Sequence, residues 1–244
     1  MILKIQNLTG GYTQGHDILQ GVDLEIKKGD SMGIIGLNGS GKSTFAKAIM
    51  NCLSYRQGSL FFNGIDISQK STQELSQLGI AMFMQGGRIF EELSVYENLL
   101  FAAKDKQKIE VVKEFFVFLQ VNFIKLRKMR ADKLSGGERH QLALAMAVLK
   151  EPSLLILDEP SAGLSPLIVN DMYKILEALR AKNNLTIILI EQNISRALDF
   201  CTSVNLLKNG KIEYTLVNPK KDGDSKDSSE NQSLKEMKKI MFNK

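Results

Sequence analysis

The sequence holds little cysteine and no long apolar run, and each shortage excludes a class of protein. The two cysteines, Cys52 and Cys201, lack the spacing of metal ligands and are too few for a disulfide framework. The first residues do not combine a basic segment with a long apolar one, and no window reaches about 18 uninterrupted apolar residues. We therefore expect a protein of a reducing compartment that is neither secreted nor membrane-spanning.

A large surplus of charge is lacking too. The formal net charge of +5 is mild for 244 residues, and the lysine-rich segment 217–244 supplies part of it. No nucleic-acid-binding stripe is implied, so we expect no nucleic-acid partner. With 43% hydrophobic residues and no internal repeat, the composition is that of an ordinary globular protein with one large domain or two small ones.

What the sequence does contain is a phosphate-binding loop. Residues 36–44 read G-L-N-G-S-G-K-S-T and directly follow a short apolar strand at 31–35. Glycines let successive backbone N–H groups approach an anion, and the following helix adds its positive N-terminal end. We expect Lys42 to reach the β- and γ-phosphates of a nucleotide and the Ser43 hydroxyl to ligate Mg²⁺. The expected phosphate-binding residues are Asn38, Gly39, Ser40, Gly41, Lys42, Ser43 and Thr44.

A second strand ends in two carboxylates. Residues 154–157 read L-L-I-L and lead into Asp158 and Glu159, which describes a buried central strand whose charges emerge at its carboxyl end. We expect Asp158 to hold Mg²⁺ through water and Glu159 to polarise the attacking water. The simpler alternative, an acidic loop after a strand, is weak because the strand follows the phosphate loop by a typical distance.

Two further candidates stand next to predicted strands. Residues 2–8 and 22–26 alternate in polarity and predict half-exposed antiparallel strands, and Tyr12 lies in the connection between them. An aromatic ring there is suited to stacking on a base, with plain turn packing as the alternative. Gln85 follows the apolar strand predicted at 79–84, at the sheet edge where open α/β sheets place ligand groups.

From residue 93 to about 149 the strand pattern gives way to helical patterns. Helices are predicted at 95–103 and over an apolar stripe formed by Ile109, Val112, Phe116 and Leu119. Ser135, Gly136 and Gly137 then precede a strong helix at 139–150, with Ser135 as its N-cap and two glycines that leave backbone N–H groups open. This predicts a second anion site, which suits a nucleotide held by another subunit. His140, on that helix, is expected to face solvent.

The remainder of the chain predicts a helix, a strand, a hairpin and a tail. Ser165 and Pro166 start a helix, residues 186–190 form a buried strand, and Asn193 caps a short helix after it. Asn209-Gly210 predicts a hairpin turn. We expect 219–232 to be a polar, partly disordered linker. Four apolar residues follow at helical spacing: Leu234, Met237, Ile240 and Met241. A short helix there would dock on the protein body, a partner or a membrane surface, and a partly disordered tail is the simpler expectation.

Taken together, these motifs resemble the ATP-binding subunit of ABC transporters over roughly residues 1–216. The L-S-G-G-E segment at 134–138 carries the resemblance, because it looks like the family signature and precedes the Asp158-Glu159 strand. A GTPase is disfavoured because no Asn-Lys-x-Asp sequence occurs. The resemblance implies an α/β P-loop NTPase fold with a mainly parallel core sheet, an N-terminal antiparallel β subdomain and an inserted helical subdomain at about 93–149. Residues 217–244 then form a polar linker and a short C-terminal helix.

The resemblance also implies roles for particular residues. Tyr12 would stack on adenine, and Gln85 would sense Mg²⁺ and report to a membrane subunit. Ser135, Gly136 and Gly137 would close over the γ-phosphate of ATP bound to the opposite subunit: two copies dock head to tail and sandwich each ATP. The cofactors are then ATP and Mg²⁺, and the partners are integral-membrane permease subunits and a second ATPase subunit, like or unlike. The expected location is the cytoplasmic face of the cell membrane.

Two positions depart from the usual family pattern. Gln192 stands where most members have a histidine that contacts the γ-phosphate, and Ser165 stands where many have aspartate. The segments 191–193 (E-Q-N) and 161–166 (S-A-G-L-S-P) are similar to those of the ATPases of branched-chain amino-acid importers, or of the similar urea importers. Import of branched-chain amino acids is the function that this similarity implies. The alternatives are a weakly hydrolysing ATP-binding partner subunit, and the ATPase of a urea importer or of a lipid or polysaccharide exporter.

Overall fold

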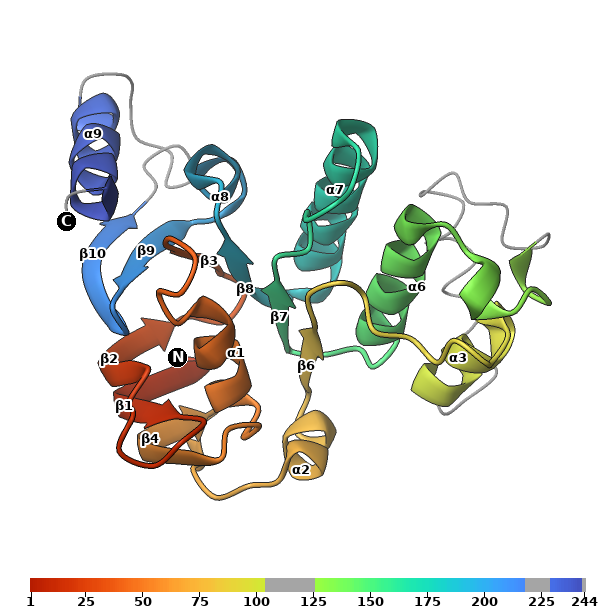
Figure 1. Cartoon of the computed structure of the whole chain (residues 1–244), viewed down its shortest axis with the longest axis horizontal. Helices are drawn as coiled ribbons and strands as arrows, with labels where there is room; N and C mark the ends of the chain where they lie inside the picture. The colour runs from red at the N-terminus through yellow and green to blue at the C-terminus, as the bar shows by residue number, and fades with distance from the viewer. Residues whose placement is uncertain (104–125, 218–228, 243–244) are drawn as a thin grey trace.

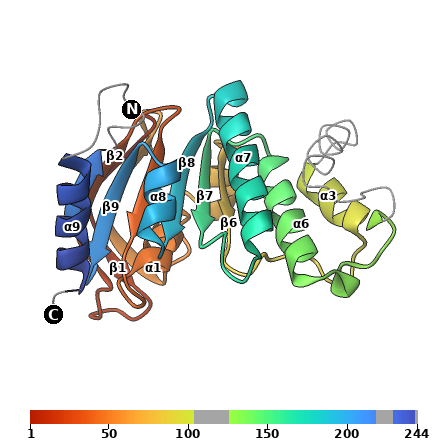
Figure 2. The same ribbon diagram turned by 90° about the horizontal axis from the view of Figure 1, so that it is seen from above.

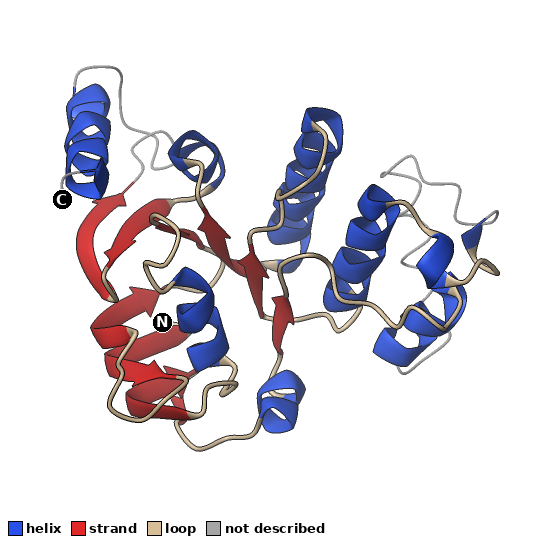
Figure 3. Ribbon diagram, in the orientation of Figure 1, coloured by secondary structure: helices blue, strands red, loops and turns tan. Residues whose placement is uncertain are grey.

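A computed structural model describes residues 1–103, 126–217 and 229–242, and these residues form two sheets with helices around them (Figures 1 and 3). Within them, one sheet has the strand order β2-β1-β4-β5 and the other β10-β9-β3-β8-β7-β6. The strands are β1 Leu3–Gly11, β2 Leu19–Ile26, β3 Ser31–Ile35, β4 Tyr55–Phe62, β5 Ile65–Asp66, β6 Ile80–Phe83, β7 Leu154–Asp158, β8 Thr186–Glu191, β9 Ser203–Lys208 and β10 Lys211–Val217. The helices are α1 Lys42–Ile49, α2 Thr72–Gln77, α3 Val95–Ala103, α6 Gly136–Val148, α7 Pro166–Asn183, α8 Ile194–Phe200 and α9 Ser229–Phe242.

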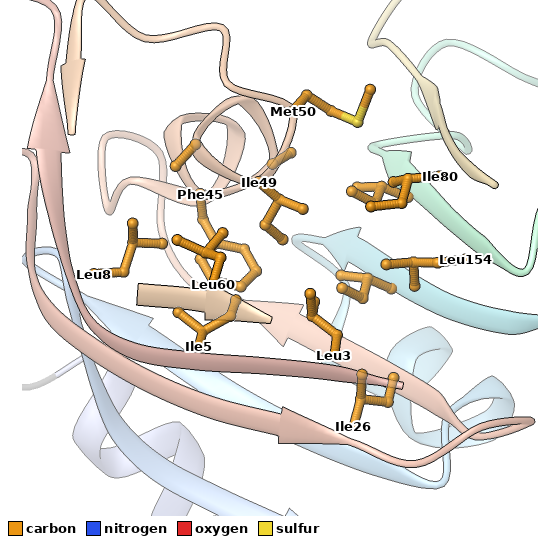
Figure 4. Close-up of a cluster of buried hydrophobic side chains, with 14 of the residues drawn as sticks. Leu3, Ile5, Leu8, Ile26, Phe45, Ile49, Met50, Leu60, Ile80 and Leu154 are labelled. Carbon is orange, nitrogen blue, oxygen red and sulfur yellow. The ribbon is translucent and has the colours of Figure 1, made fainter. Parts of the chain in front are cut away.

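The N-terminal sheet is antiparallel, as its alternating pattern predicts. β1 pairs with β2 and with β4, so that Leu3 lies opposite both Ile26 and Phe62. The apolar side chains on one face of this sheet meet Phe45 and Ile49 of α1 in a shared core (Figure 4). The sheet therefore supports the helix that begins at the phosphate loop.

The second sheet is parallel from β9 through β3, β8 and β7 to β6, and only β10 is antiparallel to its neighbour. All residues of β3, β7 and β8 are buried, because helices cover both faces. Along β7, Ile156 faces the core beneath α1, and Leu155 and Leu157 face the core formed with α6, α7 and α8. Figure 2 shows these three helices in succession. Parallel strands end at one edge of the sheet, which brings the segments after β3, β6, β7 and β8 together.

The described part of the predicted helical region agrees with its pattern. α3 matches the predicted helix at 95–103, and α6 packs against it in a separate apolar cluster that includes Val95, Leu99 and Leu142. The predicted stripe of Ile109, Val112, Phe116 and Leu119 lies outside the described residues. Among the helices in 1–103, 126–217 and 229–242, none has the length and apolar character needed to cross a bilayer.

The C-terminal helix begins earlier than expected and packs on the protein body. Residues 229–232, expected in the polar linker, are the first turn of α9. α9 packs on the body at β9 and β10, where Met237 and Met241 are buried in the core that also holds Tyr214. Lys208 donates a hydrogen bond to the carbonyl of Ile240. Of the three surfaces considered for this helix, it docks on the protein body, because burying the two methionines against the sheet removes apolar area from water.

Sequence reasoning overlooked α2. Its N-terminus carries a capping box in which the Ser71 side chain accepts from the Glu74 amide and the Glu74 carboxylate accepts from the Ser71 amide. The S-T-Q-E spelling of 71–74 was the available signal.

Candidate functional site

The phosphate loop connects β3 to α1 and is shaped by its glycines. Gly39 and Gly41 have φ angles of 80° and 104°, a conformation that side chains disfavour. A Cβ at Gly36 would lie 2.3 Å from the Leu207 carbonyl oxygen, so no larger residue fits. Gly41 caps α1 without any side-chain hydrogen bond. The first N–H groups of the helix therefore have no side-chain cap.

Lys42 is held inside this loop. Its ammonium donates to the carbonyl oxygens of Gly36 at 2.9 Å and Leu37 at 3.0 Å. Burial lowers the pKa of Lys42 from its ordinary value, and the nearby carboxylates, Glu159 first, oppose that shift. A buried cation at the end of a glycine-rich loop is a site prepared for an anion.

The other residues of the loop fit a phosphate group as well. The Ser40 hydroxyl is buried and has no hydrogen-bond partner among the described residues, so its donor is free for a phosphate oxygen. Asn38 and Gly39 are exposed at the surface of the loop, and Thr44 is buried in the first turn of α1. The predicted phosphate-binding residues are thus contiguous around one helix end.

Asp158 ends β7 directly beside the loop. The Ser43 hydroxyl donates to Asp158 Oδ1 at 3.0 Å. Burial raises the pKa of Asp158, and the hydrogen bond from Ser43 partly offsets this effect. No group of three or more His, Cys, Asp or Glu residues suited to a metal occurs in the described residues. A hydroxyl with one carboxylate is instead the donor set with which Mg²⁺ is held beside a nucleotide's phosphates.

Glu159 is the point where three predicted residues meet. Gln85, after β6, donates from Nε2 to Glu159 Oε2 at 2.9 Å, and Gln192, after β8, donates from Nε2 to Oε1 at 2.7 Å. The Lys42 ammonium lies 4.0 Å from Oε1. Glu159 itself has a φ of 48°, and its amide donates to the Ile190 carbonyl. This uncommon backbone conformation turns the carboxylate toward the loop instead of continuing the strand.

Tyr12 lies at the rim of the site with 43% of its surface exposed. Lys47, from α1, donates to its hydroxyl at 3.1 Å, and the ammonium is 5.2 Å from the ring centroid. Because the ammonium lies nearer the hydroxyl than the ring centre, we interpret this contact as a hydrogen bond rather than a cation–π interaction. Sequence reasoning missed Lys47, which stands five residues after Lys42 and thus on a face of α1 that only the fold relates to Tyr12.

Ser135 is the N-cap of α6 as predicted, but the helix begins at Gly136 and not at the predicted Arg139, so both glycines belong to its first turn. The Ser135 side chain accepts from the Glu138 amide, and the Glu138 carboxylate accepts from the Ser135 amide, which completes a capping box. Figures 1 and 2 both place α6 apart from α1, with β6, β7 and β8 between them. The residues of this predicted anion site are therefore not brought to the phosphate loop of the same chain.

The prediction for His140 is wrong. The side chain is buried, and its ring lies against Phe83 with the centroids 5.0 Å apart. Burial lowers the pKa of His140, and a hydrogen bond to the backbone of Pro160 works against that shift. The helix turns this position toward β6 and the segment after β7, a direction that the mixed polar and apolar sequence of α6 does not reveal.

Comparisons with known proteins agree with this geometry. The family model described as "ABC transporter" matches residues 19–162. The probable branched-chain amino acid transport ATP-binding protein LivF of Archaeoglobus fulgidus is 38% identical, covering 87% of this chain and 91% of the relative. The high-affinity branched-chain amino acid transport ATP-binding protein BraG of Pseudomonas aeruginosa is 34% identical, covering 89% and 94%.

Solved structures show the same fold. MJ1267, an ATP-binding cassette of an ABC transporter in its ADP conformation, superposes with a TM-score of 0.78 at 28% identity, over 90% of this chain and 92% of that one. The cassette MJ0796, as a dimeric post-hydrolysis state bound to ADP and Pi, gives a TM-score of 0.78 at 23% identity, over 88% and 98%. At 23% identity, the similarity to MJ0796 supports the fold alone.

Proposed function

Because the chain belongs to the ABC transporter family, as an ATP-binding subunit with ATPase activity, we propose that it powers the import of branched-chain amino acids through a membrane permease. The observation that carries the ATPase part of this proposal is the Glu159 carboxylate, held by Gln85 and Gln192 beside Lys42. A fixed carboxylate next to a phosphate loop is suited to orienting and polarising the water that attacks ATP.

In this proposal the phosphate loop and Tyr12 bind ATP. The phosphates occupy the loop from Asn38 to Thr44, where Lys42 supplies the positive charge and Ser40 a free hydroxyl. Adenine stacks on the exposed Tyr12 ring, which Lys47 steadies. Ser43, Asp158 and Gln85 would hold Mg²⁺, which would supply neutralisation of the negative charge on the phosphate oxygens.

Glu159 is the proposed catalytic base. Its carboxylate orients and polarises the attacking water, and the two glutamine amides fix the direction of its oxygens. The Gln192 side chain does not titrate, so it positions Glu159 without acting as an acid or base itself. The chain therefore needs no histidine at this place for a water to be aligned.

Ser135, Gly136 and Gly137 are the proposed contacts to ATP bound by a second ATPase subunit. The separation of α6 from α1 supports this assignment, because β6, β7 and β8 lie between α6 and the helix that follows the chain's own phosphate loop (Figures 1 and 2). Two copies, or one copy and an unlike partner, sandwich ATP and separate after hydrolysis removes the charge-assisted contacts.

The proposed cargo and location come from the relatives. LivF and BraG are both described as branched-chain amino acid transport ATP-binding proteins and match most of this chain. We extend that cargo to this chain and place it at the cytoplasmic face of the membrane, attached through the permease.

The test is purification of the tagged chain from native membranes, followed by reconstitution of what comes with it. We expect a permease and a second ATPase subunit, and leucine uptake into vesicles that requires ATP and stops with Glu159→Gln in this chain. Copurification with an exporter, or leucine uptake that does not saturate with leucine concentration, would contradict the proposal that branched-chain amino acids are the cargo. Full uptake with Glu159→Gln would instead identify this chain as a weakly hydrolysing partner.

A further inference from the structure

Glu191 is a buried carboxylate with no role in the steps above. It ends β8 directly before Gln192 and has 3% of its surface exposed. Its Oε2 accepts from the backbone amide of Gln192 at 3.3 Å, and its Oε1 accepts from the Tyr173 hydroxyl at 2.9 Å. A buried charge is costly unless its oxygens are hydrogen-bonded, and both oxygens of this carboxylate are.

Tyr173 reaches Glu191 from a different part of the chain. It lies on α7, two turns after the loop 161–165 that follows Glu159, and its ring packs on Phe200 with centroids 5.1 Å apart. Burial, followed by the charge of Glu191, raises the pKa of Tyr173, so its hydroxyl keeps its proton and remains a donor. The ring contact and the hydrogen bond together hold the hydroxyl in one place.

A further hydrogen bond joins the start of α8 to the segment after Glu159. Arg196, in the first turn of α8, donates from Nη1 to the Ser161 hydroxyl at 2.9 Å. The amide of Arg196 donates to Asn193 Oδ1, so the N-cap of α8 fixes the backbone of Arg196 relative to the turn at 192–193. The turn that carries Gln192 is thus tied to the segment after Glu159 through Arg196, and to α7 through Glu191.

We propose that Tyr173 and Glu191 are positioning residues that fix the turn carrying Gln192 and so direct its amide onto Glu159. The role rests on the proposed function of Glu159 as the base. Without the Tyr173 hydroxyl, the Glu191 carboxylate is free to rotate, and the backbone N–H of Gln192 loses its fixed acceptor. The Nε2 donor of Gln192 then no longer stays within hydrogen-bond range of Oε1. Since a small misplacement of a catalytic group slows chemistry steeply, kcat should fall while ATP binding is kept.

The experiment measures steady-state ATP hydrolysis by the complex of this chain with its permease and partner subunit. Tyr173→Phe should lower kcat about tenfold and leave KM for ATP within about twofold. Tyr214→Phe, which removes a tyrosine hydroxyl on β10 and touches neither Glu191 nor Gln192, is the matched control and should hydrolyse ATP like the wild type. Glu191→Gln is the second variant. It keeps the shape of the side chain, but its NH₂ group replaces one of the two accepting oxygens and so faces either the backbone N–H of Gln192 or the Tyr173 hydroxyl.

The double variant Tyr173→Phe/Gln192→Ala separates positioning from general damage. If Tyr173 acts through Gln192, kcat of the double variant equals that of Gln192→Ala alone. Multiplicative losses, or an unchanged kcat in both Tyr173→Phe and Glu191→Gln, would overturn the proposal. An inactive wild-type complex would instead contradict the proposed function, so the two failures are distinguishable.

Discussion

Gln192 and Glu159 are joined by a hydrogen bond of 2.7 Å from Nε2 to Oε1, although 33 residues separate them in the chain. A neutral amide thus contacts the carboxylate proposed as the base, at a position where a histidine is usual in the family. The amide donates without carrying charge, so the carboxylate stays available to accept a proton from water. Gln192 is therefore compatible with hydrolysis.

The first prediction concerns this contact. Gln192→Ala should lower kcat about tenfold or more, because Glu159 Oε1 loses its nearest donor, whereas Gln192→His should retain most of the activity. The measurement is phosphate release by the complex under saturating ATP. Equal activity in the alanine variant and the wild type would mean that the hydrogen bond is incidental.

Removing the charge of Glu159 should separate binding from hydrolysis. In Glu159→Gln the water loses its base, so kcat should fall by about 100-fold or more while ATP stays bound and holds two ATPase subunits together. Light scattering with ATP, in the presence of any unlike partner subunit, should report a dimer. A monomer under those conditions would argue against the sandwich.

The lowered pKa of Lys42 predicts a pH-dependent ATP affinity. In the free protein Lys42 loses its proton at a lower pH than an ordinary lysine, and bound phosphates favour the charged form. ATP affinity should therefore fall, and proton uptake on binding should rise, as pH increases toward the ordinary pKa of a lysine. Calorimetry in buffers of different ionisation enthalpy measures both quantities.

Two variants test the source of that pH effect. Lys42→Arg carries a guanidinium that does not titrate in this range, so its affinity, even if weaker, should not vary with pH. Lys42→Ala should lose tight MgATP binding altogether. Unchanged nucleotide affinity in Lys42→Ala would show that the phosphate loop has been misinterpreted.

Tyr12 should contribute through its ring more than through its hydroxyl. Tyr12→Ala should weaken ATP binding by about 1–2 kcal/mol, the loss of one stacking surface, whereas Tyr12→Phe gives up only the hydrogen bond from Lys47 and should stay within about twofold of the wild type. Equilibrium binding of a fluorescent ATP analogue gives both numbers. Equal losses in the two variants would make the hydroxyl contact the important one.

The docking of α9 predicts a stability effect remote from ATP. Met237 is fully buried between α9 and the sheet, so Met237→Ala should lower the free energy of unfolding by about 2–4 kcal/mol. Met84→Ala removes the same side chain at a position that is 41% exposed and should cost less than about 0.5 kcal/mol. Urea denaturation followed by circular dichroism compares them. Similar midpoints would mean that α9 adds little to the folded state.

The phosphate loop and the acidic strand could be predicted because local sequence specifies them. Gly36, Gly41 and Lys42 follow a strand at fixed spacing, and Asp158 follows four apolar residues, so chain geometry alone puts each group at the end of a buried strand. The hairpin turn predicted at Asn209-Gly210 has positive φ at both residues, and Asn63-Gly64, between β4 and β5, has the same conformation.

The sequence by itself determined which elements form and which groups stand at their ends, since backbone propensity and hydrophobic period act over a few residues. Only the tertiary structure decided which of those groups meet: Gln85 and Gln192 on Glu159, Lys47 on Tyr12, and His140 against Phe83. It also decided that α9 covers the chain's own sheet. These contacts join residues far apart in the chain, and they depend on strand order and helix rotation, which packing of the whole core sets.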